Sequence, residues 1–145
     1  MSKTFTLGEA QTVLPVVAAL LKRAQAAEMR ADMIEVEMQD LNHRIFLSGG
    51  MYINVATAAR RRAERDKAMQ EAKVTLAELE EIGVQVKDVD EGLLDFPCVI
   101  DGRTVLLCWK LGEKEIGYWH APEDGDQERR PLDGRFGRQD RERLN

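Results

Sequence analysis

Three side chains in the C-terminal half of the sequence have the chemistry of metal ligands or of a nucleophilic centre: Asp95, Cys108 and His120. A zinc site needs three or four such ligands that converge on one point, and a cysteine nucleophile needs a base within reach. Whether these side chains meet depends on the strands that carry them. The hydrophobic periodicity of the chain predicts those strands.

An alternation of apolar and polar residues predicts an antiparallel sheet over residues 84–120. Asp101-Gly102 lies between two apolar runs and is typical of a two-residue hairpin turn. That turn pairs Asp95 with Cys108 and places both on one face of the sheet. Cys98 falls on the opposite face, so the two cysteines should not form a disulfide with each other.

A second tight turn, at Gly112-Glu113, would bring Cys108 beside Gly117. In this register His120 points to the face opposite Asp95 and Cys108. The sequence therefore predicts no metal site, no catalytic residues and no cofactor, and it favours a protein without enzymatic activity. In this interpretation His120 closes the edge of the core, and Cys108 is a small buried side chain.

The densest aromatic cluster is Tyr118-Trp119-His120. Such a cluster at the end of a strand is compatible with a ligand cleft. Packing in the core or in an interface is the other interpretation, and the sequence leaves both open. The residues of the candidate cleft are Asp95, Trp109, Tyr118, His120 and Arg130.

Residues 6–82 have the pattern of a long antiparallel helical hairpin. Thr6-Leu7-Gly8-Glu9 is a capping box that starts the first helix. Pro15 has no amide proton and its ring clashes with the preceding turn, so we expect a short helix up to Leu14 and then a kink or a fresh start at Pro15. Beyond it, apolar residues follow the 4-3 spacing of a coiled-coil seam: Leu20, Ala24, Ala27, Ala31, Ile34, Met38, Leu41 and Ile45.

Ser48-Gly49-Gly50 interrupts this spacing and predicts the turn of the hairpin. The second helix is expected from about Ile53 to Ile82. Its basic segment Arg60–Lys67 could contact nucleic acid, but a net charge of −5 and the acidic stretch Asp32–Asp40 favour ion pairs between the two helices. The apolar positions expected in its seam are Val55, Ala59, Met69, Ala72, Leu76 and Leu79.

The length of 145 residues suits a single α+β domain over residues 1–132, with a polar tail over residues 133–145 that is expected to be disordered. No apolar run is long enough to span a bilayer and no targeting segment is evident, so we expect a cytoplasmic protein without a membrane partner. Both faces of the predicted sheet are apolar, and a long hairpin buries little surface by itself. These two features predict a homodimer.

Several short stretches of the sequence, taken together, are specific. They include Phe5-Thr6-Leu7-Gly8-Glu9-Ala10, Gly92-Leu93-Leu94-Asp95-Phe96-Pro97, Leu107-Cys108-Trp109-Lys110-Leu111-Gly112-Glu113, Tyr118-Trp119-His120 and Arg130-Pro131-Leu132. With these stretches the chain resembles, over about residues 5–132, the uncharacterised prokaryotic family called domain of unknown function 2203. The resemblance implies a similar fold and a small, free-standing bacterial or archaeal protein, and it implies no activity. Segment Ala121–Arg129 and the extension beyond Leu132 depart from the family pattern.

The sequence thus predicts an α+β fold in which a long helical hairpin precedes a small antiparallel sheet of three to four strands. It favours a non-enzymatic, self-associating interaction or scaffold protein with a protein partner. The alternative is a small-molecule-binding or catalytic protein with a cleft near residues 118–120. Nucleic-acid binding through Arg60–Lys67 is the third hypothesis.

Overall fold

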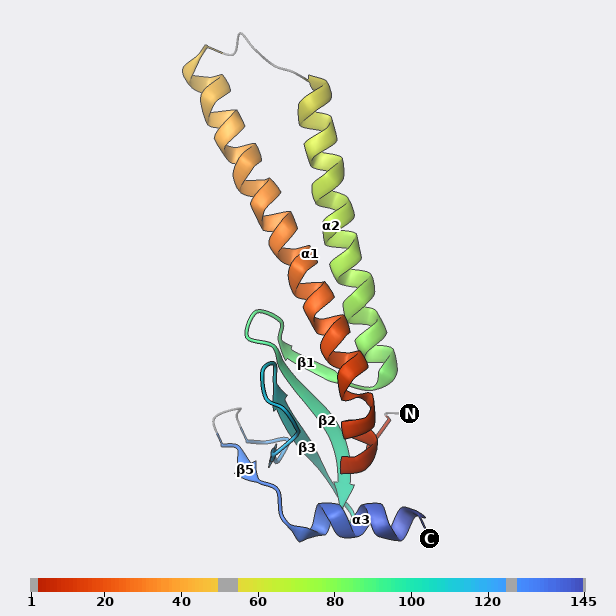
Figure 1. Cartoon of the computed structure of the whole chain (residues 1–145). Coiled ribbons are helices and arrows are strands. Elements are labelled where there is room, and N and C mark those ends of the chain that lie inside the picture. Colours follow the sequence, from red (N-terminus) through yellow and green to blue (C-terminus); the bar gives the residue numbers. More distant parts are fainter. Residues whose placement is uncertain (1–2, 50–54, 125–127, 145) are drawn as a thin grey trace. The chain divides into compact units, whose positions relative to one another are not determined.

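The computed structural model describes residues 3–49, 55–124 and 128–144, and it confirms the α+β class (Figure 1). Two long helices precede an antiparallel sheet, which has five strands where the sequence predicted three or four. The helices are α1 Leu7–Leu47, α2 Val55–Ile82 and α3 Gly134–Leu144, and the strands are β1 Gln85–Asp88, β2 Leu93–Ile100, β3 Arg103–Lys110, β4 Tyr118–His120 and β5 Arg130–Pro131.

The chain divides into two compact units. One comprises residues 1–21 and 76–145 and contains the whole sheet, the start of α1, the end of α2 and all of α3. The other comprises residues 22–75, which are the remaining parts of the two long helices.

Helix α1 is continuous through Pro15, so the helix does not end at Leu14 and start afresh at Pro15. The capping box forms as expected: the Thr6 amide donates to Glu9 Oε1 at 2.8 Å, and the Glu9 amide donates to Thr6 Oγ1 at 3.2 Å. The Pro15 ring is exposed, whereas Val17 on the inner side of the same helix is fully buried. Burial of this face stabilises the helix by more than the single hydrogen bond that proline removes.

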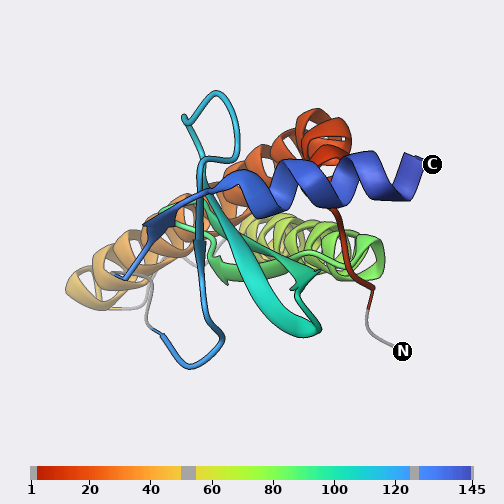
Figure 2. The ribbon, with the colours of Figure 1, turned by 90° about the horizontal axis from the view of Figure 1, so that it is seen from below.

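The five strands follow one another in the sheet in sequence order. One face of the sheet carries Phe96, Cys98 and Leu107 and forms the core together with the first turns of α1 and with Phe136 of α3. Figure 2 shows α3 beside the start of α1 in this unit. The core therefore lies on one side of the sheet, and the side chains that alternate with it point to the other.

The C-terminal segment, for which the sequence predicted disorder, contains the helix α3. Asp133 caps its first turn, because its Oδ1 accepts from the Arg135 amide at 3.0 Å. Phe136 is fully buried, with its ring centroid 6.0 Å from that of Trp119. On the same helix, Gln139 Oε1 accepts a hydrogen bond from the Cys98 thiol at 3.4 Å, and Gln139 Nε2 donates one to the Val99 carbonyl. One aromatic anchor and specific polar contacts hold a segment that is otherwise too polar to be recognised as helix from sequence.

In the second unit, the seam residues of α1 are the buried ones: Ala24, Ala27, Ala31 and Ile34 are at most 7% exposed. On α2 the seam runs through Ala68 and not through Met69, which is 54% exposed. The expected ion pairing between the helices is present, since Arg65 Nη1 lies 2.7 Å from Glu35 Oε2. Arg61 likewise pairs with Glu37 at 3.1 Å. The predicted turn residue Gly50 lies outside the described residues.

The register of the first hairpin is as predicted, with Asp95 opposite Cys108 and Cys98 opposite Val105. The register of the next strand was wrong by one residue. Cys108 lies opposite Tyr118, not Gly117. Because side chains alternate along a strand, this single step moves His120 to the other face of the sheet.

Candidate functional site

His120, Asp95 and Cys108 meet on the face of the sheet opposite the main core. They come from three neighbouring strands, β4, β2 and β3. All three are buried, with at most 1% of each residue exposed. Their potential ligand atoms all lie within 4.8 Å of one another. The three residues therefore form one cluster. The sequence placed His120 on the opposite face only because the predicted register between β3 and β4 was wrong by one residue.

Both ring nitrogens of His120 face oxygen atoms. Nδ1 lies 3.0 Å from the Ala121 carbonyl oxygen, and Nε2 lies 3.1 Å from Asp95 Oδ1. A carbonyl oxygen only accepts, so Nδ1 carries the hydrogen. The other carboxylate oxygen of Asp95, Oδ2, lies 3.8 Å from Lys87 Nζ. The Lys87 side chain is 39% exposed.

The loop between β3 and β4 explains why the sequence missed this cluster. Residues 111–117 form a wider connection than the two-residue turn that Gly112-Glu113 suggested. Glu113 holds the loop: its Oε1 accepts from the Lys110 amide at 2.7 Å, and its carbonyl accepts from Trp109 Nε1 at 3.0 Å. Its carboxylate also pairs with Arg129 at 2.8 Å. A contact with a residue sixteen positions away carries no short-range signal.

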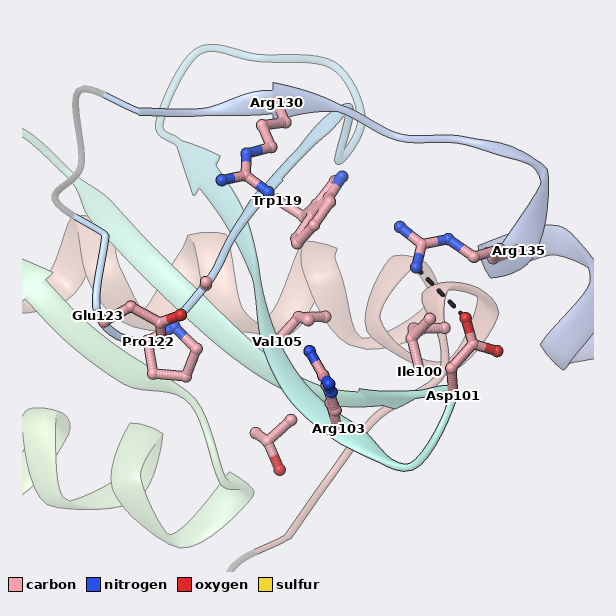
Figure 3. A pocket seen from close by; sticks show the side chains of 11 residues that line it. Ile100, Asp101, Arg103, Val105, Trp119, Pro122, Glu123, Arg130 and Arg135 are labelled. Carbon is pink, nitrogen blue, oxygen red and sulfur yellow. Dashed lines mark hydrogen bonds and ion pairs between the residues drawn. The ribbon is translucent and has the colours of Figure 1, made fainter.

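A cleft of about 560 Å³ lies on the opposite face of the sheet, over the ends of β2, β3 and β4 (Figure 3). Its walls combine aromatic and apolar side chains with three arginines. Figure 3 shows Trp119 between Arg130 and Arg135, with Arg103 on the facing wall. The lining residues are Ile100, Asp101, Arg103, Thr104, Val105, Trp119, Ala121, Pro122, Glu123, Arg130 and Arg135.

The Trp119 ring contacts two of these cations. The guanidinium carbon of Arg130 lies 5.0 Å from the ring centroid, and that of Arg135 lies 5.5 Å from it. Both distances are within the range of cation–π attraction. Each guanidinium also has an acid partner: Arg130 pairs with Asp124 at 3.1 Å and Arg135 with Asp101 at 3.3 Å. The indole is thereby fixed as a flat wall of the cleft.

Arg103 differs from the other two arginines of the cleft. Its side chain is exposed, and within the described ranges no carboxylate pairs with it. Hydrogen bonds to Asp133 and then to Asp101 raise the pKa of Arg135, and the bond to Arg135 lowers the pKa of Asp133. The cleft thus holds two arginines, Arg130 and Arg135, whose charges are balanced by nearby carboxylates. The third, Arg103, has no such partner among the residues that the structure describes.

The five residues of the predicted cleft lie in different places. Asp95 and His120 are bonded to each other on the face away from the cleft. Trp109 is buried in the main core. Tyr118 is 38% exposed, with the Arg129 guanidinium carbon 4.3 Å above its ring, and Arg130 lines the cleft. Sequence reasoning missed Arg103 and Arg135, although Arg103 follows the Asp101-Gly102 turn and is exposed for that reason.

A family model described as Uncharacterized conserved protein (DUF2203) matches residues 3–132. The chain belongs to this family. The match covers both long helices and all five strands and stops before α3, so the clustered residues and most of the cleft lie inside the DUF2203 region. No curated protein and no solved structure matches the chain. Among the described residues, no helix has both the length and the apolar character needed to cross a bilayer.

Proposed function

We propose that this DUF2203 protein binds a small organic anion in the cleft between Arg103 and Trp119. The observation that carries the proposal is the guanidinium of Arg103, which lines a concave site and has no carboxylate partner among the described residues. Guanidinium groups bind carboxylate and phosphate oxygens through two parallel hydrogen bonds. An exposed arginine on a flat surface would be unremarkable, but this one faces an aromatic wall across a cavity.

The remaining walls favour a ligand that has a flat, apolar part beside its acid group. Trp119, Val105 and Pro122 supply apolar surface, and the indole offers a ring on which another ring can stack. The volume of about 560 Å³ is in the range of pockets that hold cofactor- or metabolite-sized molecules. An aromatic carboxylate and a nucleotide share this chemistry.

The test is a binding titration with a panel of aromatic carboxylates and nucleoside phosphates, in which the fluorescence of Trp119 reports binding. Trp109 is buried in the core, and its emission should stay constant. Arg103→Gln should weaken binding by about tenfold or more, because it removes a charge-assisted pair. The matched control is Arg23→Gln, an exposed arginine of α1 in the other unit. Equal affinity of both variants, or no binding by any member of the panel at low salt, would contradict the proposal.

Self-association is a second candidate, and it rests on a different observation. Met29, Met33 and Val36 form an exposed stripe on one side of α1, each at least 60% exposed. Their spacing of four and three places them on one face of the helix. We propose a second copy of the chain as the occupant. Outside the ion pairs of Arg61 and Arg65, this unit exposes acidic residues on α1 and basic residues on α2, so two copies offer complementary charges: Asp32 and Asp40 on α1, and Arg60, Arg62 and Lys67 on α2.

The mass of the protein in solution tests this candidate. Light scattering at micromolar concentration should give twice the chain mass for the wild type and the chain mass for Met33→Glu. Gln39→Glu, at another exposed position of the same helix, adds the same charge outside the stripe and should leave the dimer intact. A monomeric wild type would eliminate the proposal, and a dimeric Met33→Glu would move the interface elsewhere.

A further inference from the structure

The cluster of Asp95, Cys108 and His120 plays no part in the cleft, which lies on the other face of the sheet. It combines a carboxylate, a thiol and an imidazole in a buried place. Burying three such polar groups is costly unless they bind one another or a cation. The Asp95–His120 pair accounts for two of them, and the thiol of Cys108 lies within the same 4.8 Å group.

The orientation of His120 is set by the backbone. Because Nδ1 donates to the Ala121 carbonyl, Nε2 is the atom that faces Asp95. Histidine ligands in metal sites usually donate a hydrogen bond from the ring nitrogen that does not bind the metal, often to a backbone carbonyl. Between Nε2 and Oδ1 of Asp95 there must be either a proton or a cation, since two lone pairs at 3.1 Å repel each other.

The same geometry argues against a cysteine nucleophile. A catalytic histidine must present one ring nitrogen to the thiol in order to take its proton. Both nitrogens of His120 already face oxygen atoms, one on Ala121 and one on Asp95. The cluster is also closed to solvent, so a substrate could not reach Cys108 without opening the sheet.

We propose that Asp95, Cys108 and His120 bind a zinc-class divalent cation that links strands β2, β3 and β4. Imidazole and thiolate are ligands that zinc prefers, and a carboxylate completes a common set. On binding, two protons are released to solvent: the proton of the Cys108 thiol and the proton between His120 Nε2 and Asp95 Oδ1. The sulfur, the ring nitrogen and the carboxylate oxygen then form the bonds to the metal.

The distances are compatible with this ligand set. Zinc bonds of about 2.0–2.3 Å place the ligand atoms of a tetrahedral site roughly 3.3–3.8 Å apart. Asp95 Oδ1 and His120 Nε2 are already 3.1 Å apart, and no pair in the cluster exceeds 4.8 Å. Side-chain rotations that move the sulfur by about one ångström would close the site.

Two cations near the cluster do not oppose a metal ion. Lys87 lies 3.8 Å from the Asp95 carboxylate, but its side chain is 39% exposed and is screened by water. Arg129, which interacts electrostatically with Cys108, is balanced by its ion pair with Glu113 at 2.8 Å. The cluster itself contributes two negative charges once the thiol is ionised, which matches a divalent ion.

The experiment measures zinc in the protein purified without chelators, by elemental mass spectrometry. The wild type should carry about one equivalent per chain. The zinc content of Cys108→Ser should be lower than that of the wild type by about tenfold or more. Cys98→Ser is the matched control, because Cys98 is also buried and unpaired with another cysteine but lies on the opposite face, and it should keep its zinc.

A second measurement uses the wild type alone, so it does not depend on any variant folding. After removal of zinc with a chelator, Co²⁺ should produce the sulfur-to-cobalt charge-transfer absorption of a thiolate ligand and raise the thermal midpoint. Absence of that absorption, or equal zinc in Cys98→Ser and Cys108→Ser, would overturn the proposal and assign the cluster to a proton-linked Asp95–His120 pair. Anion binding in the cleft would be unaffected by that outcome, since it depends on Arg103.

Discussion

The backbone amide of Gly8 donates to both carboxylate oxygens of Asp140, at 3.1 Å to Oδ1 and 2.9 Å to Oδ2. Gly8 lies in the first turn of α1, where amides have no partner within the helix. The carboxylate therefore does for α1 what a bound anion does at other helix starts. A Cβ at position 8 would lie 2.9 Å from Asp140 Oδ1, so a larger residue there would have to displace the carboxylate.

This relationship predicts that α3 detaches when Asp140 is changed. Asp140→Ala removes the carboxylate from the helix start and should lower the free energy of unfolding by about 1–2 kcal/mol. Amide hydrogen exchange in residues 134–141 should accelerate in parallel. Asp40→Ala, at an exposed position of α1, is the control and should change neither quantity.

Gly8→Ala and Asp140→Ala together form a double-mutant cycle. Alone, Gly8→Ala should destabilise the protein, because the new methyl group displaces the carboxylate. In the Asp140→Ala background the clash is gone, and the helix preference of alanine should make Gly8→Ala neutral or stabilising. The same cost in both backgrounds would show that the contact is not what position 8 requires.

Two glycines with the same backbone conformation separate strain from packing. Gly92 and Gly102 have φ values of 72° and 77°, a region that alanine adopts at a cost of about 1 kcal/mol. A Cβ on Gly92 would lie 2.6 Å from the Leu111 Cβ, whereas a Cβ on Gly102 would meet nothing within 4 Å. In urea unfolding, Gly92→Ala should therefore destabilise by clearly more than Gly102→Ala. Equal effects would mean that Leu111 moves away without cost.

Cys98 makes stability depend on alkaline pH. Burial, and then the charges of Asp140 and Glu9, raise the pKa of its thiol from 9.0 to about 11. Between these values the unfolded chain releases the thiol proton and the folded chain keeps it, so stability falls as pH rises through this window. Cys98→Ser, which does not titrate there, should show a shallower loss of thermal midpoint from pH 9 to pH 11. Parallel curves for the two proteins would contradict this account.

The ion pair between Arg65 and Glu35 predicts a charge-reversal experiment in the helical unit. Glu35→Arg replaces the ion pair, which has a distance of 2.7 Å, by two like charges and should lower the thermal midpoint. The double reversal, Glu35→Arg with Arg65→Glu, should recover most of the loss at low salt, and high salt should reduce the difference. A double variant no better than the single one would show that the pairing has no stabilising role.

Local signals predicted the parts of this fold that depend on neighbours in sequence. The Thr6 cap, the Asp101-Gly102 turn and the middle of the predicted α1 seam, from Ala24 to Ile34, are present in the structure. The turn residues have the positive φ values of a two-residue hairpin, 52° and 77°. The expectation at Pro15 considered only the hydrogen bond that proline removes and the clash of its ring. The buried face of the helix around Pro15 keeps the helix continuous.

The candidate sites depended on contacts between distant residues and were predicted only in part. The sequence brought Asp95 to Cys108 through a turn that it specifies. It could not place His120, because the 111–117 loop is held by Glu113 and Arg129. It could not place Arg135 in the cleft either, because Phe136, Gln139 and Asp140 hold α3 through contacts with residues far away in the sequence.

The length of the loop between Lys110 and Tyr118 has a consequence for comparing this chain with relatives. One residue more or fewer at that point would exchange the surroundings of Tyr118, Trp119 and His120 together, moving the indole away from the arginines and the imidazole away from the thiol. A homologue that conserves all these side chains but differs in loop length would therefore have neither arrangement. Gaps in an alignment at this loop are more informative than substitutions around it.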